Sequence, residues 1–490
     1  MSTRAIKFDA VGTKPGGVQP YFDRRSTIAV GLTALVAIAI QSLWIPIDAD
    51  VSWLITVSER VLSGDRLYVE IFELNPPASV WLYVPLVWLA ELIGAKPEAV
   101  VAAGFVTAGL ASVRASIGLA SRLDVVPSPV WLAGALSFIA LVLPMALFAQ
   151  REHAALLLAM PALVALAVIG EGKPLPRPAT YATGFAAGLV IVIKPYFLLA
   201  VVAPALWVAF RRRSLSPLLP GIVAATVAIG LYAVALLAFS RAYFDWLPVI
   251  AHTYAPMHET LWKVAVGPAL YPAICFGLAA LLRAPKIPSI AVTWGLGSLG
   301  FLLAAYVQAK NYPNHWLPGA ALALGAAFTM LTLPQIAQIR RAAIGVGLAT
   351  VALSVMYHWA IRPDAAVAAA VREVGPPAPK MIALSPQLVT GHPVTRNVGG
   401  HWVGSRAGLF TASGARFAGL DDPLAQQFYR EDINSFATDI ERNSPDVILV
   451  HRPTKSWLMR EQAIANAMSA YRIAARANDT EIWVARDQRR

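Results

Sequence analysis

The 490-residue chain is poor in charged residues and almost lacks cysteine. Only 14% of its residues are Asp, Glu, Lys or Arg, whereas a soluble globular domain carries about a quarter. Its one cysteine, Cys275, lies inside an apolar run, which excludes a disulfide framework and a cysteine metal site. The chain also shows no internal repeat and no low-complexity segment. These absences argue against an ordinary soluble domain, a disulfide-stabilised secreted domain and a repeat protein.

Apolar residues make up 57% of the chain and raise its mean hydropathy to +0.59. Runs of about 20 apolar residues recur along most of its length, and such runs can cross a bilayer as helices. The pattern predicts a mainly α-helical, polytopic membrane protein with about 11–13 transmembrane helices. The expected spans are 27–46, 78–95, 97–118, 127–149, 153–170, 179–193, 197–210, 216–239, 264–282, 289–308, 316–333 and 342–361.

The net charge of +12 does not indicate a nucleic-acid partner, because the basic residues gather in short loops between apolar runs. Such loops are typical of the cytoplasmic side of a membrane protein. The first 26 residues are polar, and the run that follows is too long for a signal-peptide core and lacks a cleavage site, so we interpret it as a retained anchor. The basic loops are Arg24/Arg25, Lys173/Arg177, Arg211–Arg213, Arg283/Lys286 and Arg340/Arg341.

The loop charges predict residues 1–25 to be a cytoplasmic tail, 26–362 a transmembrane domain, and everything after 362 to lie outside. An inside N-terminus and an outside C-terminus require an odd number of crossings, whereas twelve segments are apolar. The conflict lies between Pro77 and Gln150, where three apolar segments stand in place of two or four. Either 78–95 or 97–118 is therefore expected to be interfacial or incomplete, and the sequence leaves open which.

Residues 363–490 differ in character from the rest of the chain. Short apolar segments at Met381–Leu384, Val447–Val450 and Glu481–Val484 alternate with amphipathic stretches near 423–443 and 456–475. This alternation predicts a small α/β domain. It would lie in a bacterial periplasm or its equivalent, with the chain in the cytoplasmic membrane and in contact with its lipids.

The stretch from Asp48 to Pro77 is acidic although it directly follows the first apolar run. Apolar residues recur at helical spacing from Val51 to Leu62, and Ser63-Gly64 follows, which predicts an interfacial helix within the outer loop at 48–77. Asp50 lies near its N-terminus, where it is either an N-cap or a functional carboxylate. Asn75-Pro76-Pro77 predicts a rigid, extended entry into the next helix. The acidic residues are Asp48, Asp50, Glu59, Asp65, Glu70 and Glu73.

Three further polar patches interrupt apolar runs on the predicted outer side. They are Gln150-Arg151-Glu152-His153, Lys194-Pro195-Tyr196 and Lys310-Asn311-Tyr312-Pro313-Asn314-His315-Trp316. Ionisable residues at membrane depth more often have a function than not. Lys194 can also be a snorkelling lysine, and the aromatic residues can form an interfacial belt. Tyr254, in the loop at 241–263, is a further candidate for contact with the substrate. Together the patches predict one site for an anionic, phosphate-bearing substrate.

The order of these features resembles a known family. One span, an outer loop with an early Asp, the motif Ser63-Gly-Asp-x-Leu-Tyr68, and Asn75-Pro-Pro at the start of the next helix are similar to the GT-C membrane glycosyltransferases. The likeness is greatest to their protein mannosyltransferase-like and lipid A aminoarabinose transferase-like branch. Arg151-Glu152-His153 resembles the second acidic loop of that family, and Lys310 to His315 resembles its Lys-x-x-x-Tyr-His motif. In layout the resemblance covers residues 25–360.

The resemblance implies transfer of a sugar from a polyprenyl-phosphate donor to a hydroxyl of an envelope glycan, lipid or protein. The early Asp of the family then maps to Asp50, with Asp48 as its rival, as the base that takes the hydroxyl proton. Cations would stabilise the departing phosphate. The residues expected to bind substrate are Arg151, Glu152, His153, Lys194, Tyr196, Lys310, Tyr312, His315, Glu70, Glu73, Asn75 and Tyr254.

Two questions stay open at this stage. Asp48 or Asp50 with Glu152 offers oxygen ligands that would suit a divalent cation such as Mg²⁺ or Mn²⁺, and Glu70 and Glu73 either bind a metal or contact the acceptor. The alternative function is a transporter or flippase of lipid-linked saccharides. A transporter usually places its ionisable groups near the bilayer midplane and shows repeat symmetry, so the outer position of the charges here favours the enzyme.

Overall fold

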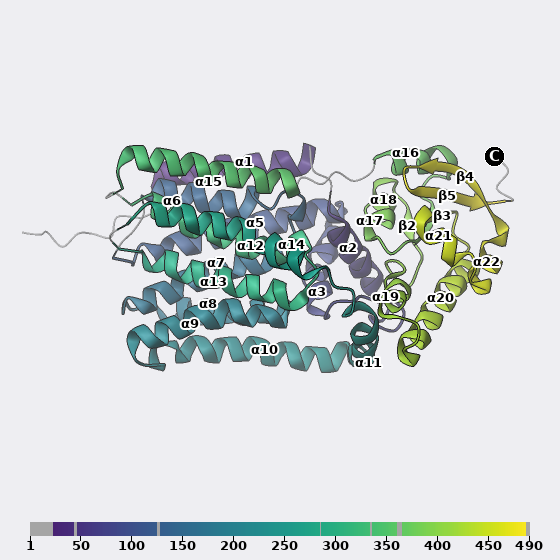
Figure 1. Cartoon of the computed structure of the whole chain (residues 1–490), viewed down its shortest axis with the longest axis horizontal. Coiled ribbons are helices and arrows are strands. Elements are labelled where there is room, and N and C mark those ends of the chain that lie inside the picture. The colour runs from purple at the N-terminus through teal and green to yellow at the C-terminus, as the bar shows by residue number, and fades with distance from the viewer. Residues whose placement is uncertain are drawn as a thin grey trace, which may run out of the picture.

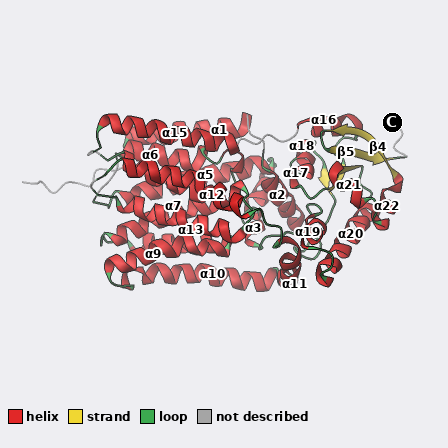
Figure 2. Cartoon of the chain, in the orientation of Figure 1, coloured by secondary structure: helices red, strands yellow, loops and turns green. Residues whose placement is uncertain are grey.

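The computed structural model describes residues 23–43, 47–124, 128–284, 286–333, 336–359 and 365–486. The chain forms two parts that lie end to end along its long axis, a bundle of long helices and a smaller α/β domain (Figure 1). The strands are confined to the second part, as Figure 2 shows. The predicted mainly α fold with a small C-terminal α/β domain is confirmed. The expected boundary at 362/363 and most of the tail 1–25 lie outside the described residues.

Within the described residues, all twelve apolar segments expected from the sequence fall on helices of the bundle; residues 44–46, 127, 360 and 361 of these segments lie outside the described ranges. The long helices are α1 (Arg24–Leu43), α5 (Pro97–Ala120), α6 (Pro129–Ser137), α7 (Arg151–Gly170), α8 (Arg177–Ile193), α9 (Leu198–Arg212), α10 (Leu219–Phe239), α12 (Leu261–Leu281), α13 (Ser289–Gln308), α14 (Pro313–Leu331) and α15 (Gln338–Trp359). Shorter elements connect them: α2 (Ala49–Leu62), α3 (Ala78–Trp81), α4 (Val84–Ile93), η1 (Phe138–Val142), η2 (Met145–Leu147), η3 (Pro195–Phe197), η4 (Ser216–Leu218), α11 (Tyr243–Val249) and η5 (Ile250–Tyr254).

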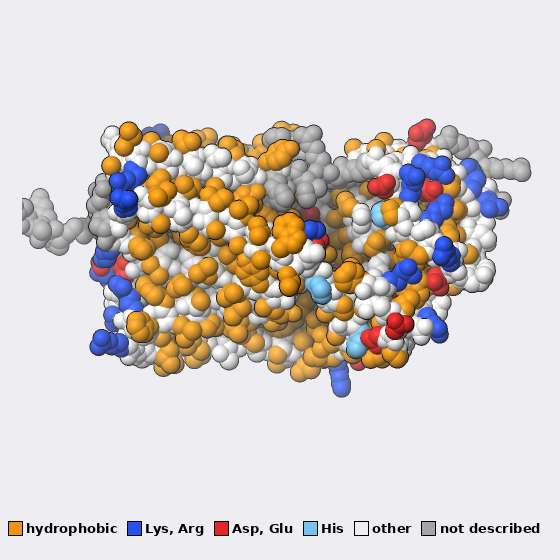
Figure 3. Space-filling view, viewed as in Figure 1, with side chains coloured by type: hydrophobic (Ala, Val, Ile, Leu, Met, Phe, Trp, Pro, Cys, Tyr) orange, Lys and Arg blue, Asp and Glu red, His pale blue; other side chains and the backbone are white. Residues whose placement is uncertain are grey.

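The composition of the helices separates lipid-facing from buried ones. Within the described ranges, eight helices are long and apolar enough to cross a membrane. The most apolar window, in α10, is only 11% buried, whereas that of α7 is 83% buried. Apolar side chains cover the flank of the bundle, and Lys and Arg gather at the end away from the α/β domain (Figure 3). This is the surface of a multi-pass membrane protein.

The structure indicates which segment fails to cross. Phe72, which precedes α3, donates its backbone N–H to Ser405 O in the α/β domain (2.9 Å). Glu98, in the first turn of α5, pairs with Arg396 of the same domain. The segment 78–95 therefore begins and ends at one end of the bundle, and α5 crosses it. The eight helices that are long and apolar enough to cross a membrane, counted together with α6, α8 and α14, number eleven among the described residues, which is the kind of odd number that the expected topology requires.

The α/β domain is a five-stranded mixed sheet with the strand order β2-β1-β3-β5-β4. The strands β1 and β2 and the strands β1 and β3 pair parallel, whereas β3 with β5 and β5 with β4 pair antiparallel. The strands are β1 (Lys380–Leu384), β2 (His401–Trp402), β3 (Val447–His451), β4 (Tyr471–Ala477) and β5 (Thr480–Ala485). The helices are α16 (Ala365–Val374), α17 (Leu388–Gly391), α18 (Val394–Asn397), α19 (Phe410–Ala418), α20 (Pro423–Asn443), α21 (Arg452–Leu458) and α22 (Gln462–Ala467).

The three strands and the helix at 423–443 that the sequence predicts are confirmed as β1, β3, β5 and α20. The stretch 456–475 differs from the expectation of one amphipathic segment, because it is divided among the end of α21, α22 and the start of β4. Successive residues of β1 and β3 point to opposite faces of the sheet. One face packs against α20, and the other belongs to a hydrophobic core that continues through Trp402 and Trp53 into the bundle.

Candidate active site

The helix α2 begins at the end of the bundle that faces the α/β domain. Its N-cap is Asp48, whose carboxylate accepts the backbone N–H of Asp50 (2.8 Å) and the side-chain amide of Gln150 (2.7 Å). The interpretation of Asp50 as the N-cap is therefore wrong, because the helix begins one residue earlier than that role requires. Burial, and then the Asp50 carboxylate, raise the pKa of Asp48 to about 7. Asp48 thus has a structural task at the helix end.

The Asp50 carboxylate is half-buried, and the structure assigns it neither a hydrogen bond nor an ion pair with any described residue. Burial raises the pKa of Asp50; Arg151 and Lys194 act against this, and Glu152 and Glu73 add to it. We call these five side chains, Asp50, Glu73, Arg151, Glu152 and Lys194, the ion cluster. A carboxylate with a raised pKa and no partner is suited to take a proton.

Arg151 lies at the first position of α7 and is only 4% exposed. Its Nη1 is 3.8 Å from Glu73 Oε1, too far for a hydrogen bond, and neither Nη1 nor Nε has a hydrogen-bond partner among the described residues. Buried guanidinium donors without partners are costly, and they suit an anionic ligand that would satisfy them. The N-terminus of α7 adds to this preference, because the helix dipole favours a negative charge there.

Glu152 and Lys194 form a fully buried ion pair next to Arg151. Lys194 Nζ is 2.5 Å from Glu152 Oε1, and Lys194 also donates to Gln308 Oε1 (3.2 Å). Asn314 donates to the same Glu152 oxygen (3.1 Å), and the other oxygen has no hydrogen-bond partner among the described residues. The pair joins the start of α7 to the end of α8 and the start of α14, so three distant sequence patches meet here.

Glu73 is the acidic residue of the outer loop that enters the cluster. It is buried, accepts Trp53 Nε1–H at Oε2 (2.6 Å), and accepts the backbone N–H of Asn75 at Oε1 (3.0 Å). The Asn75 side-chain amide donates to Oε1 as well. Asn75 therefore orients Glu73. Glu70, by contrast, is exposed and pairs with Arg66 (3.1 Å), so the structure does not bring it into the cluster.

His153 and Lys310 are bonded elsewhere in the fold. His153 is fully buried, its Nδ1 accepts Ala149 N–H (3.1 Å), and its Nε2 lies 2.7 Å from Ala140 O. Lys310 donates to the carbonyls of Tyr254 (2.5 Å) and Met257, and burial lowers the pKa of Lys310 to about 8. Both side chains have the partners of structural groups.

His315 lies within the electrostatic reach of Glu152 and Lys194, and its Nδ1 has no hydrogen-bond partner among the described residues. Tyr254 and Tyr312 lie at the border of the cluster: burial is the main cause that raises the pKa of each hydroxyl, and the Asp50 charge contributes. Tyr196 is 47% exposed and has no bond to the cluster. Of these four predicted residues, His315, Tyr254 and Tyr312 thus lie near the ion cluster, and Tyr196 does not.

The sequence interpretation missed several partners. Gln150 and Asn314 stand inside patches that were recognised, and Gln308 is a polar residue at the outer end of an apolar run, so each left a weak signal. Trp53 left none, because it continues the apolar face of α2. As for the metal hypothesis, the described residues contain no group of three His, Cys, Asp or Glu side chains that could hold a metal ion, so Asp48, Asp50 and Glu152 do not form one.

The arrangement combines an unpaired carboxylate with buried, unpaired guanidinium donors at one end of a membrane bundle. It can accept a proton from a neutral group and hold an anion nearby. The surface between the bundle and the α/β domain is hollowed on the face shown in Figure 3, so the two parts do not close over this end completely on that side.

Neither a known family profile nor a curated protein sequence matches the chain. Among solved structures, the apo crystal structure of ArnT from Cupriavidus metallidurans is similar, with a TM-score of 0.54, 15% identity, and 94% of this chain and 96% of that one covered. The archaeal oligosaccharyltransferase AglB from Archaeoglobus fulgidus, in complex with a peptide and dolichol-phosphate, gives 0.46, 12% identity, and 92% and 73% coverage. The mycobacterial arabinofuranosyltransferase AftD has a TM-score of 0.48 and 13% identity, with 94% of this chain and 40% of that chain covered. The likeness to ArnT confirms the expected GT-C fold over nearly the whole chain.

Proposed function

We propose that the chain is a glycosyltransferase that moves a sugar from a polyprenyl-phosphate donor to a hydroxyl of a cell-envelope glycan, lipid or protein. The observation that carries the proposal is that the ion cluster contains both an Asp50 carboxylate without a partner and buried Arg151 N–H groups without a hydrogen-bond acceptor among the described residues. The likeness of the fold to that of ArnT supports the proposal.

In the proposed reaction the acceptor hydroxyl lies beside Asp50 and the donor phosphate lies against Arg151. The acceptor oxygen forms a bond to the anomeric carbon while the bond from that carbon to the phosphate oxygen breaks. The hydroxyl proton passes to the Asp50 carboxylate, and the electron pair leaves with the polyprenyl phosphate. Arg151, and Lys194 behind it, stabilise the charge that develops on the leaving phosphate, in a buried site where such stabilisation is strong.

The proposed orientation places the basic end of the bundle in the cytoplasm and the α/β domain in the periplasm of a bacterial cell. Arg211, Arg212 and Arg213 end α9 at the basic end, as the positive-inside rule requires. The ion cluster then faces the outer leaflet, where lipid-linked sugars and envelope acceptors meet. The position at one end of the bundle also supports an enzyme over a transporter, whose site would lie near the bilayer midplane.

Asp50→Asn tests the assignment of the base. We expect the variant to lose transfer from a panel of polyprenyl-phosphate monosaccharides in membrane fractions by at least about 100-fold, because general-base catalysis contributes roughly 10²–10⁴-fold. Asp48→Asn removes a neighbouring carboxylate that caps α2 and should keep measurable activity. Glu70→Gln is the matched control, because its carboxylate is exposed and pairs with Arg66. Full activity of Asp50→Asn would exclude Asp50 as the base.

A further inference from the structure

One arginine of the α/β domain forms an ion pair with α2, the helix that carries Asp50. Arg396, in α18, binds both oxygens of Glu59 in α2, with Nη1–Oε2 at 2.6 Å and Nη2–Oε1 at 2.9 Å. Its Nε binds Glu98 of α5 at 2.5 Å. The Arg396 side chain is only 12% exposed. A bidentate, largely buried arginine pair has a defined geometry, so Arg396 fixes α2 against α5.

A second contact of the same domain reaches the ion cluster through Trp53. The rings of His392 and Trp402 lie 5.0 Å and 6.2 Å from the Trp53 ring, centroid to centroid. Trp53 in turn donates its indole N–H to Glu73 (2.6 Å), and Glu73 lies 3.8 Å from Arg151. A series of contacts therefore runs from the α/β domain to the guanidinium that we assign to the donor phosphate.

The spacing within α2 links both contacts to Asp50. Trp53 stands three residues after Asp50, and residues at this spacing are neighbours on a helix surface. Glu59, farther along the same helix, sets the position of the whole helix through Arg396. A displacement of α2 by about 1 Å would move the carboxylate out of hydrogen-bond reach of an acceptor hydroxyl.

We propose that the α/β domain positions the catalytic carboxylate and the donor-binding arginine, with Arg396 and Trp53 as positioning residues. This inference rests on the proposed function. It assigns the domain a task in the reaction in addition to any contact with the acceptor.

Arg396→Gln and Trp53→Phe test the inference in the purified full-length protein. We expect each to lower kcat for transfer from a polyprenyl-phosphate monosaccharide by roughly 10-fold to 100-fold, with less than a threefold change in KM. Trp53→Phe keeps an aromatic ring beside His392 and Trp402 and removes the indole N–H that donates to Glu73. Arg430→Gln, an exposed arginine of the same domain, is the matched control and should leave kcat unchanged. Thermal unfolding of every variant measures any loss of folding.

Hydrogen exchange of residues 49–62 supplies a second readout that does not need turnover. Arg396→Gln should increase exchange in α2 while exchange in α7 and α13 stays as in the wild type. If both variants keep the wild-type kcat while Asp50→Asn is inactive, the positioning role is excluded and the proposed function stands. If Asp50→Asn keeps full activity, Asp50 is excluded as the base, and if the wild type itself transfers no sugar, the proposed function is excluded. A loss of kcat that only follows a fall in Tm would make Arg396 a folding residue and overturn the inference.

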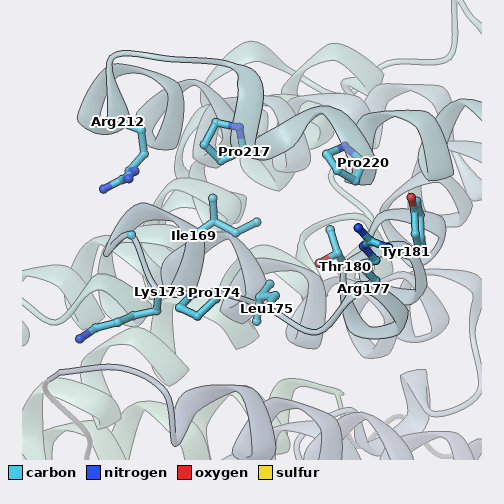
Figure 4. A pocket seen from close by; sticks show the side chains of 11 residues that line it. Ile169, Lys173, Pro174, Leu175, Arg177, Thr180, Tyr181, Arg212, Pro217 and Pro220 are labelled. Atoms are coloured by element: carbon cyan, nitrogen blue, oxygen red, sulfur yellow. The ribbon is translucent and has the colours of Figure 1, made fainter.

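An independent observation lies at the opposite end of the bundle. A cavity of about 340 Å³ lies between the loop that joins α7 to α8 and the loop that joins α9 to α10. Lys173 and Arg212 stand at one side of it and Arg177 at the other, with Ile169, Leu175 and Pro217 between them (Figure 4). The cavity thus combines cations at its rim with apolar side chains between them.

The charges at this cavity are only partly neutralised. Lys173 pairs with Asp124 (2.6 Å), whereas neither Arg177 nor Arg212 has an ion pair with a described residue. Arg212 lies close against Gly172, whose φ is +76°, and a Cβ at that position would lie 2.4 Å from the Arg212 Nη1. We also infer that this cavity binds the headgroup of an anionic phospholipid of the adjacent leaflet, because basic pockets between helices at that side suit a lipid phosphate.

Retention of phosphatidylglycerol by the purified protein in neutral detergent, measured by native mass spectrometry, tests this site. Arg177→Gln with Arg212→Gln should weaken retention by roughly 30-fold, about fivefold for each cation. The double variant Arg122→Gln with Arg283→Gln removes two exposed arginines from the same end and should have little effect. An equal loss of phosphatidylglycerol retention in both double variants would mean that only the net charge matters and would exclude a lipid site in this cavity. Displacement by millimolar inorganic phosphate, or equal retention of phosphatidylcholine, would also overturn it.

Discussion

Replacing Lys194 by Met is expected to destabilise the bundle, because it leaves the Glu152 carboxylate buried without its cation. The two side chains are 7% and 0% exposed, and their charged atoms are 2.5 Å apart. Removing one partner of a buried ion pair costs about 3–5 kcal/mol. Asn314 keeps its hydrogen bond to Glu152 and Arg151 stays nearby, so we expect the lower value, about 3 kcal/mol, and a fall in Tm of roughly 3 °C.

The assay is thermal unfolding in detergent for Lys194→Met, Glu152→Gln and the double variant. The double variant buries no unpaired carboxylate, so it should recover about 2 kcal/mol relative to the sum of the single changes. Lys263→Met breaks the exposed pair with Glu259, 46% and 43% exposed, and is the matched control with an expected cost below about 0.5 kcal/mol. Wild-type stability of Lys194→Met, or additive single effects, would refute the buried ion pair.

Two further predictions follow from Asp48 and Lys310. The pKa of Asp48 is raised to about 7 in the folded protein. The stability that protonated Asp48 contributes is therefore fully present below the ordinary pKa of a carboxyl and is lost as the pH rises through about 7. Asp48→Asn should flatten the dependence of Tm on pH between about 4 and 7. Lys310→Met should lower stability by about 1–3 kcal/mol, because the carbonyls of Tyr254 and Met257 lose their donor, and should leave the binding of polyprenyl phosphate by the purified protein within threefold of the wild type. A large loss of polyprenyl-phosphate binding in Lys310→Met would show that Lys310 binds the substrate, as the sequence analysis expects.

The sequence predicts the fold well where the signal is local. The apolar runs predict the helices of the expected spans, because a bilayer requires about 20 apolar residues for each span and their lengths can be counted. The helix from Ala49 to Leu62 and three of the strands follow from periodicity alone. The incomplete crossing at 78–95 could not be chosen from the sequence, because the deciding contact joins Glu98 to Arg396, 298 residues later.

The candidate site divides in the same way. That the four polar patches lie at one end of the bundle follows from loop charge, and the structure brings Glu152 and Lys194 into contact, with Arg151 and His315 nearby. Which side chain pairs with which depends on how the helices pack, so Lys310 and His153 could not be recognised as bonded elsewhere. Trp53 has its role because Glu73 and the α/β domain pack against it, and nothing in its own segment signals that.

The most direct test of the account is sugar transfer by the purified protein in proteoliposomes that contain a radiolabelled polyprenyl-phosphate sugar and an envelope acceptor extract. We predict a new glycosidic bond and an equal amount of released polyprenyl phosphate for the wild type, and neither product for Asp50→Asn. Movement of the intact lipid-linked sugar between leaflets, without bond formation and at the same rate in both proteins, would contradict the account.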